Sequence, residues 1–282
     1  MSLSVATWNI NSVRLRIDNV LRFLAESDID VLCLQETKTV DGLFPSEAFT
    51  QAGYPHQVVH GMKGYNGVAI VSRLPFETTG DAISSGASGT KQWCGKEDCR
   101  HAWVRLHHGV EVHSLYIPAG GDVPDPVENV KFAHKLQFLD ELTAWLAGGA
   151  STRGRMILTG DFNVAPLEHD VWSHKQLLKI VSHTPVEVEK LTAFRAAGAF
   201  VDAVRHFVPE SEKLYSWWSY RSSDWALANK GRRLDHIWVT PDLMPYLGSY
   251  EITKAARGWP QPSDHVPVSV RFEGIQGLLS GN

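Results

Sequence analysis

Short apolar runs and longer amphipathic segments alternate along the chain. Runs with the length and composition of strands lie at 3–10, 30–36, 67–72, 102–106, 110–117, 156–159 and 233–239. Several of them are apolar almost throughout, which is typical of strands that are buried on both faces. The runs therefore predict strands that lie in the interior of the protein.

Three segments between these runs have helical patterns. In segment 15–27 the spacing places Val20 and Leu24 inward and Arg16 and Arg22 outward, and segment 128–146 carries a similar apolar stripe. Thr184, Pro185 and Glu187 form an N-cap signature, which predicts a helix as far as Ala197. Strands alternate with helices in both halves, and no low-complexity linker interrupts them. The pattern predicts one α/β domain over residues 1–282, or two similar halves packed sheet to sheet.

Composition narrows the class of protein. Hydrophobic residues make up 43% and charged residues 21% of the 282 positions, so a large core is expected and disorder is not. No stretch approaches the roughly 20 apolar residues of a membrane span, and the start of the chain lacks the pattern of a signal peptide. We expect a cytoplasmic protein with no membrane contact. The formal net charge of −4 neither requires nor excludes nucleic acid, because binding phosphates needs only local positive charge.

The three cysteines are too few for a disulfide framework. Cys33 lies in an apolar run and is expected in the core. Cys94 and Cys99 have the spacing of half a zinc site, but no second ligand pair follows with suitable spacing. A loop with two free or reversibly paired thiols is the preferred interpretation.

Polar residues recur where the apolar strands end. The clearest case is the run 156–159, which stops at Gly160 and leads into Asp161, Phe162 and Asn163. Because side chains alternate along a strand, Asp161 and Asn163 should share one face while Phe162 enters the core. An Asx turn that merely ends a strand would give the same local pattern, but its repetition along the chain favours a site. The full set of polar residues at strand ends is Asn9, Asn11, Glu36, Tyr116, Asp161, Asn163, Asp235, Asp264 and His265.

Carboxylates and amides dominate this set. Hard oxygen ligands without a cysteine partner favour Mg²⁺, with Mn²⁺ as the alternative, over zinc. Hydrolysis of a phosphoester with the help of a metal needs a cation, a base for water and donors for the charge on phosphorus. The set offers a candidate for each of these roles.

Seven motifs, in chain order, resemble those of the exonuclease III family of abasic-site (AP) endonucleases, within the endonuclease, exonuclease and phosphatase superfamily. They are Trp8–Arg14, Leu34–Lys38, Gly67–Ile70, Leu115–Pro118, Gly160–Asn163, Arg233–Ile237 and Ser263–Pro267. The resemblance implies a four-layer α/β sandwich of the deoxyribonuclease I type, with two packed mixed β-sheets flanked by helices. It also implies metal-dependent hydrolysis of DNA 5′ to abasic sites, together with 3′-to-5′ exonuclease and 3′-phosphatase activity.

The resemblance also implies roles for individual residues. Glu36 would be the main metal ligand, with Asn9, Asn11 and Asp264 as direct or water-mediated ligands, and Asp161, Asn163 and His265 would lie close enough to join them. Asp161 would activate water, Asn163 and Tyr116 would donate to the phosphate or to the leaving oxygen, and His265 would contact the phosphate while Asp235 holds it. Sequence leaves open whether Asp161 or His265 is the base, and we favour Asp161.

Segment 213–233 is the strongest candidate for selecting the substrate. It interleaves aromatic residues with Lys213, Arg221, Lys230, Arg232 and Arg233, a pattern suited to stacking beside a gap in DNA while cations bind phosphates. Trp217, Trp218 and Arg221 are the predicted contacts. Weaker candidate contacts to the DNA backbone are Arg14, Lys38, Tyr65 and Asn66.

The expected partner is double-stranded DNA with abasic sites or 3′ ends, bound by a monomer. Two other functions stay open. One is hydrolysis of a non-DNA phosphoester by the same kind of site, and the other is DNA binding by a relative without catalysis.

Overall fold

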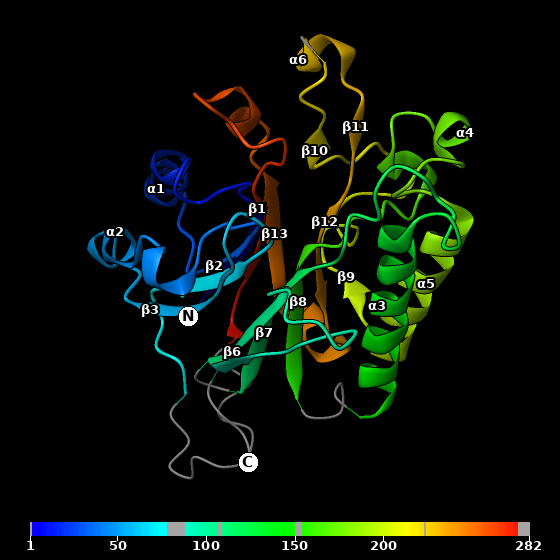
Figure 1. The fold of residues 1–282 in the computed structure, drawn as a ribbon. Helices are drawn as coiled ribbons and strands as arrows, with labels where there is room; N and C mark the ends of the chain where they lie inside the picture. Colours follow the sequence, from blue (N-terminus) through cyan, green and yellow to red (C-terminus); the bar gives the residue numbers. More distant parts are fainter. Residues whose placement is uncertain (1, 78–87, 107–108, 150–153, 223, 276–282) are drawn as a thin grey trace.

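Two mixed β-sheets lie face to face at the centre of the molecule, with helices on both outer sides (Figure 1). The computed structural model describes residues 2–77, 88–106, 109–149, 154–222 and 224–275. Within these residues the first sheet has six strands in the order β13-β14-β1-β2-β4-β3, and the second has six in the order β5-β6-β7-β8-β12-β9. This arrangement confirms the predicted four-layer α/β sandwich.

The strands of the first sheet are β1 (Leu3–Asn9), β2 (Val31–Gln35), β3 (His56–His60), β4 (Val68–Ser72), β13 (Leu247–Ile252) and β14 (Val268–Phe272). Those of the second sheet are β5 (Ser88–Thr90), β6 (His101–Leu106), β7 (Val110–Tyr116), β8 (Arg155–Asp161), β9 (Val201–Asp202) and β12 (Asp235–Val239). A separate hairpin is formed by β10 (Trp217–Trp218) and β11 (Gly231–Arg232). Each sheet contains one parallel pair, β1 with β2 and β7 with β8, and its other pairs are antiparallel.

The helices are α1 (Ile17–Glu26), α2 (Ser46–Gln51), α3 (Val130–Ala147), α4 (His174–Leu177), α5 (Pro185–Ala197) and α6 (Trp225–Ala228). Short 3₁₀ turns are η1 (Asp41–Leu43), η3 (Glu168–Asp170), η4 (Pro241–Tyr246) and η5 (Lys254–Gly258). Helices α1 and α2 cover the first sheet, and α3 and α5 cover the second (Figure 1). None of the described helices combines the length and apolar content needed to cross a membrane.

Alternation along the strands explains the layers. In β2, Val31 and Cys33 pack into the core between the two sheets, while Leu32 and Leu34 pack outward beneath the helices. In β8, Ile157 faces the other sheet, and Met156 and Leu158 face α3 and α5. The predicted core position of Cys33 is confirmed, and all three cysteines are free.

Several predicted boundaries were wrong. The strand predicted at 156–159 continues through Gly160 to Asp161 because those residues still pair with β7 and β12. Arg16, predicted to point outward, is 9% exposed and donates hydrogen bonds to the carbonyl of Asn11 and the hydroxyl of Tyr220. The helix starts at Ile17, two residues later than the predicted start at Leu15, so Arg16 belongs to the loop beside the polar strand ends.

Candidate active site

Register across three neighbouring strands of the second sheet brings Tyr116, Asp161 and Asp235 side by side. Tyr116 at the end of β7 pairs with Asp161 at the end of β8, and Asp161 pairs with Asp235 at the start of β12. In the first sheet Asn9 pairs with Gln35, so Glu36 follows directly beside it. The side-chain amide of Asn9 then joins the two sheets, donating to Oε1 of Glu36 and to Oδ2 of Asp161, each at 2.9 Å.

Gly160 allows β8 to come close to β7. Its φ is 144°, and a Cβ at this position would lie 1.9 Å from the carbonyl oxygen of Leu115. A side chain would therefore push the two strands apart. The glycine before Asp161 is required by packing, and it sets the position of the carboxylate that follows.

Two hydrogen bonds from Asn163 fix the position of the Asp161 carboxylate. Its φ of 54° lies in the left-handed region, its N–H donates to Oδ1 of Asp161 at 2.9 Å, and its side-chain amide donates to Oδ2 at 3.1 Å and to the carbonyl of Ile117 at 2.9 Å. Phe162 is buried and stacks on His236. The predicted sharing of one face by Asp161 and Asn163 is therefore confirmed. In this arrangement the amide hydrogens of Asn163 orient Asp161 and Ile117 rather than pointing to a free phosphate position.

His265 lies between two carboxylates. Its Nδ1 is 2.8 Å from Oδ2 of Asp235, and its Nε2 is 3.7 Å from Oδ2 of Asp161. The hydroxyl of Ser216 also donates to Oδ2 of Asp235, at 2.6 Å. Burial alone would lower the pKa of His265, but the charges of Asp235 and Asp161 outweigh it and raise the pKa. The imidazole is therefore held as a charged donor whose Nε2 faces Asp161.

The pKa of Asp161 is also raised, but here burial outweighs the effect of the opposite charge nearby. Burial raises the pKa of its carboxyl group, the charge of His265 and the donor Asn9 lower it, and the charges of Asp235 and Glu36 raise it further. A carboxylate with a raised pKa, held by amide donors at the floor of a cleft, has the properties of a proton acceptor.

Glu36 is the centre of the second group of polar residues. Nζ of Lys38 lies 2.7 Å from its Oε2, and the hydroxyl of Tyr116 donates to its Oε1 at 2.9 Å. Burial and the neighbouring Glu36 charge raise the pKa of Tyr116 well above its usual value, so the phenol stays a donor. The same Lys38 ammonium donates to Oδ1 of Asn11 at 2.7 Å, and Asn11 donates to Oδ1 of Asp264 at 3.3 Å.

These donors fit a divalent metal. Oxygen atoms of Glu36 and Asn11 already converge on a cationic group, the ammonium of Lys38, and the donor set consists of hard oxygens. Ligand atoms of Asp161, Asp235 and His265 also lie within 4.8 Å of one another. We favour Glu36 as the main ligand because the imidazole of His265 already fills the space between the two aspartates.

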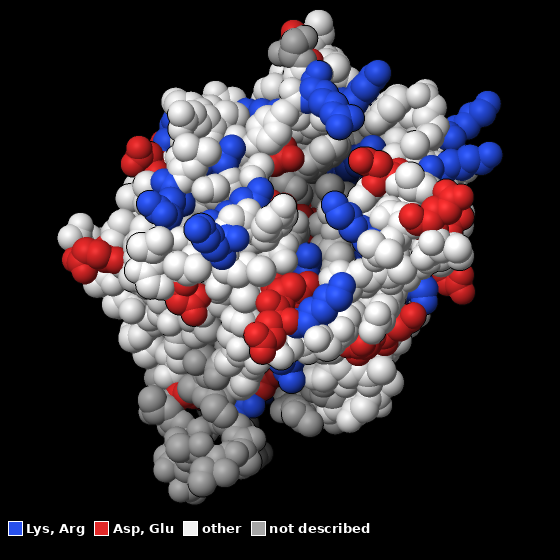
Figure 2. All heavy atoms as spheres, in the orientation of Figure 1, with Lys and Arg blue, Asp and Glu red and all other residues white. Residues whose placement is uncertain are grey.

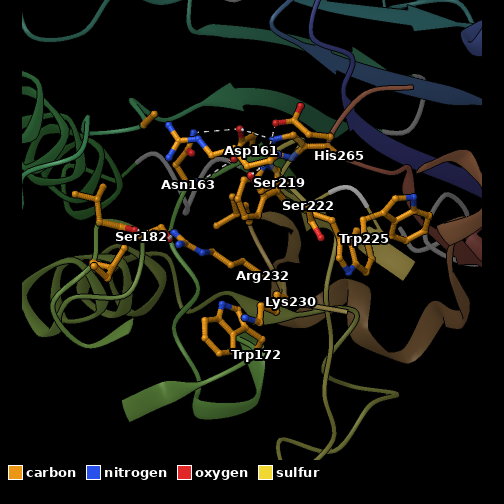
Figure 3. A pocket seen from close by; sticks show the side chains of 18 of the residues that line it. Asp161, Asn163, Trp172, Ser182, Ser219, Ser222, Trp225, Lys230, Arg232 and His265 are labelled. Carbon is orange, nitrogen blue, oxygen red and sulfur yellow. Dashed lines mark hydrogen bonds and ion pairs between the residues drawn. The ribbon is translucent and has the colours of Figure 1, made fainter. Parts of the chain in front are cut away.

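A cleft of about 780 Å³ opens over these residues. Its lining includes Glu36, Asp161, Asn163, Asp264 and His265. Figure 3 shows Asp161, Asn163 and His265 together at one end. The other lining residues of the cleft include four tryptophans and three cations, beside small polar and apolar residues and Asp122. These aromatic and cationic residues are Trp172, Trp217, Trp218, Trp225, Arg221, Lys230 and Arg232. Figure 2 shows Lys and Arg side chains gathered over the β10–β11 hairpin and on the surface near α1, around a hollow in this face.

The two predicted recognition tryptophans differ. Trp217 lines the cleft and is half-buried, and its indole N–H donates to Oδ2 of Asp264 at 2.9 Å. Trp218 is only 2% exposed, packs against Tyr215 and Trp225, and donates to the side chain of Asn229. Trp218 also lines the cleft, but it supports the hairpin from within, and its contact with DNA stays a prediction. Arg221 is exposed and lines the cleft, as the prediction requires.

The weaker candidate contacts to the DNA backbone differ in their distance from the cleft. Arg14 and Tyr65 are exposed but do not line the cleft. The amide of Asn66 donates to the carbonyl of Asp98 at 2.9 Å and accepts from Arg100 at 3.1 Å, so it holds a loop together. The carbonyl of Asn66 accepts from the N–H of Lys38, which places this loop beside Glu36.

Sequence reasoning missed three supporting residues. Lys135 is fully buried in α3, where its Nζ donates to the carbonyl of Asn163 at 2.8 Å and pairs with Glu187 of α5. Its position on the apolar stripe shared by Leu139 and Leu142 was a readable signal, because a lysine there must find a buried partner. Ser216 and Trp172 carried no comparable signal.

The chain resembles known proteins in both sequence and fold. The model of the endonuclease/exonuclease/phosphatase family matches residues 6–265. An exodeoxyribonuclease of Bacillus subtilis (strain 168) is 29% identical over 272 residues, covering 95% of this chain and 98% of that protein. A solved AP endonuclease from Archaeoglobus fulgidus is 32% identical with a TM-score of 0.85, covering 96% of this chain and 99% of that one. A 3′ phosphatase, NExo, from Neisseria, solved with a product DNA hairpin, is 29% identical with a TM-score of 0.85 and the same coverage.

This chain belongs to the endonuclease/exonuclease/phosphatase family and, within it, to the exonuclease III family of AP endonucleases. The predicted resemblance is confirmed, and so is the assignment to nucleases that hydrolyse phosphodiester bonds.

Proposed function

We propose that this protein is a DNA repair nuclease that hydrolyses the phosphodiester 5′ to abasic sites in double-stranded DNA and also acts at 3′ ends. Relatives named as an exodeoxyribonuclease, an AP endonuclease and a 3′ phosphatase support it. The main support for the proposal is the set of residues that line the cleft. One end has the carboxylates and imidazole of a phosphoester hydrolase, and the other end has tryptophans and cations suited to a nucleic acid.

Asp161 takes the proton from the attacking water in this proposal, because two amide groups fix its carboxylate at the floor of the cleft. His265, oriented by Asp235, donates to the phosphate through Nε2. Tyr116 presents its hydroxyl beside Glu36, where it stabilises charge on the leaving oxygen. The proposed metal, Mg²⁺ or alternatively Mn²⁺, would be held by Glu36 with Asn11 and Asp264, and would supply positive charge to the phosphate oxygens.

Residues 1–282 act as one domain in this proposal, and as a monomer. The supporting observation is that both sheets of a single chain supply the site, with Asn9 and Glu36 from the first and Tyr116, Asp161 and Asp235 from the second. Neither sheet alone holds the complete set.

The Asp161→Asn variant tests the proposal. It keeps the shape of the side chain but removes the proton acceptor, so turnover on an abasic duplex should fall by about 10²- to 10⁴-fold. The dissociation constant for the same DNA, measured by fluorescence anisotropy, should change less than about threefold. A variant that keeps wild-type turnover would contradict the role of Asp161. Wild-type protein that binds the duplex without cutting it would instead identify a DNA-binding relative without catalysis.

A further inference from the structure

Two consecutive arginines, Arg232 at the end of β11 and Arg233 directly after it, have opposite surroundings. Arg233 is 2% exposed, and its guanidinium donates to both carboxylate oxygens of Asp202 at 2.6 Å, with Asp170 at 3.7 Å. Arg232 lines the cleft together with Asp161 and His265, and it forms no ion pair with any described residue. The sequence does not distinguish the two arginines, but in the fold only Arg233 has carboxylate partners among the described residues.

Arg232 is nevertheless fixed in place. Its Nη1 donates to the carbonyl of Val181 at 2.9 Å and to the hydroxyl of Ser182 at 2.7 Å, and its guanidinium lies 5.3 Å from the ring centre of Trp217. Its Nε is buried without a partner, and its Nη2 makes no hydrogen bond to the described part of the chain. A rigid guanidinium with an unused Nη2 and no ion-pair partner among the described residues is suited to binding an anion.

The surroundings of Arg232 favour a phosphate. Lys230 lines the same wall, with its ammonium 4.7 Å from the ring centre of Trp172, and likewise has no carboxylate partner among the described residues. Figure 3 shows Arg232 between the Asp161 end of the cleft and the Trp172–Lys230 end. The carboxylates are confined largely to the catalytic end and to Asp122. An uncompensated cation in a partly buried wall lowers stability, and such departures from ordinary packing rules are typical of functional sites.

We propose that Arg232, assisted by Lys230, binds a second phosphate of the DNA, distinct from the phosphate that is cleaved, with the adjoining sugar or base against Trp172 and Trp217. The proposal rests on the proposed function and assigns a binding residue to the same cleft. It predicts a contact to the DNA backbone, so the effect of losing it should not depend on base sequence.

The salt dependence of binding tests this subsite. Measured by anisotropy in the Asp161→Asn background, Arg232→Gln should weaken binding about tenfold, equally for two duplexes of different sequence. The slope of log K against log salt should become shallower by about 0.9, the value for one lost phosphate contact. Arg232→Lys keeps the charge and should restore the slope. Arg22→Gln removes an exposed arginine of α1 that does not line the cleft and should leave the slope unchanged.

A purely structural role for Arg232 would give another pattern. Arg232→Gln would then lower the melting temperature while leaving the slope intact, and Arg232→Lys would not restore what was lost. That result would overturn the subsite while leaving the proposed function standing. Failure of the Asp161→Asn protein itself to bind DNA would overturn the proposed function and the subsite together.

Discussion

The buried ion pair between Lys135 and Glu187 supports three segments at the edge of the cleft. Nζ of Lys135 donates to the carbonyls of Asn163 at 2.8 Å and Ala119 at 3.3 Å, and Glu187 accepts from the backbone of Ser182 at 2.9 Å. Both side chains of the pair are 0% exposed. Replacing Lys135 by Met keeps the volume but leaves the Glu187 carboxylate buried without its counter-ion.

The expected loss can be worked out from this arrangement. Breaking a buried pair by removing one partner costs about 3–5 kcal/mol. An unfolding entropy of roughly 2.1 cal/mol/K per residue gives about 0.6 kcal/mol/K for a chain of 282 residues. The melting temperature of Lys135→Met should therefore fall by about 5–8 °C. Turnover should fall as well, because the carbonyl of Asn163 loses the donor that fixes the residue next to Asp161.

Two further variants make the measurement specific. Adding Glu187→Gln removes the stranded charge, so the double variant should recover at least half of the lost melting temperature but not the lost turnover. Lys190→Met breaks an exposed pair with Asp140 between the same two helices and should shift the melting temperature by less than about 2 °C. A Lys135→Met protein that melts within about 2 °C of the wild type, by circular dichroism at pH 7.5, would refute the reasoning.

Three other predictions follow from single contacts. Gly160→Ala should destabilise by more than about 3 kcal/mol or prevent folding, because its Cβ would meet the Leu115 carbonyl, whereas Gly42→Ala, with open space around it, should be close to neutral by urea denaturation. Tyr116→Phe removes the hydroxyl that donates to Glu36 and should lower kcat about 100-fold with a nearly unchanged melting temperature; an unchanged kcat would show that the hydroxyl is dispensable. Burial lowers the pKa of His236 to about 3, below its value of about 6.5 in the unfolded chain. Below pH 6.5 the unfolded chain therefore binds a proton that the folded protein does not. The contribution of neutral His236 to the free energy of unfolding is complete above pH 6.5 and declines as the pH falls toward 3. Between pH 7.5 and 5.0 the wild type should lose about 2 kcal/mol more stability than His236→Gln, and equal losses would contradict this assignment.

The central strands could be predicted from sequence because burial on both faces leaves a plain apolar run. The strands β1, β2 and β8 have this character, and their polar ends mark the site. The edge strands β3 and β13 were missed because their residues are only partly buried, so their sequences carry too few apolar side chains.

Long-range partners could not be predicted from the sequence. Arg232 and Arg233 look alike in the chain, and only the fold shows that Asp202 and Asp170 neutralise one of them. Trp217 and Trp218 are likewise neighbours and both line the cleft, yet Trp217 is half-buried and Trp218 is almost completely buried against Tyr215 and Trp225. Whether a side chain is free to bind a ligand depends on contacts between segments that are distant in sequence.

The most direct test of the proposed function is incision of a duplex oligonucleotide that carries one abasic analogue, with Mg²⁺ and with EDTA. An intact duplex and a phosphoinositide serve as controls. The proposed function predicts metal-dependent cutting on the 5′ side of the abasic site, far faster than internal cutting of the intact duplex. Release of phosphate from the phosphoinositide with no cutting of DNA would contradict it and would leave only membership of the superfamily.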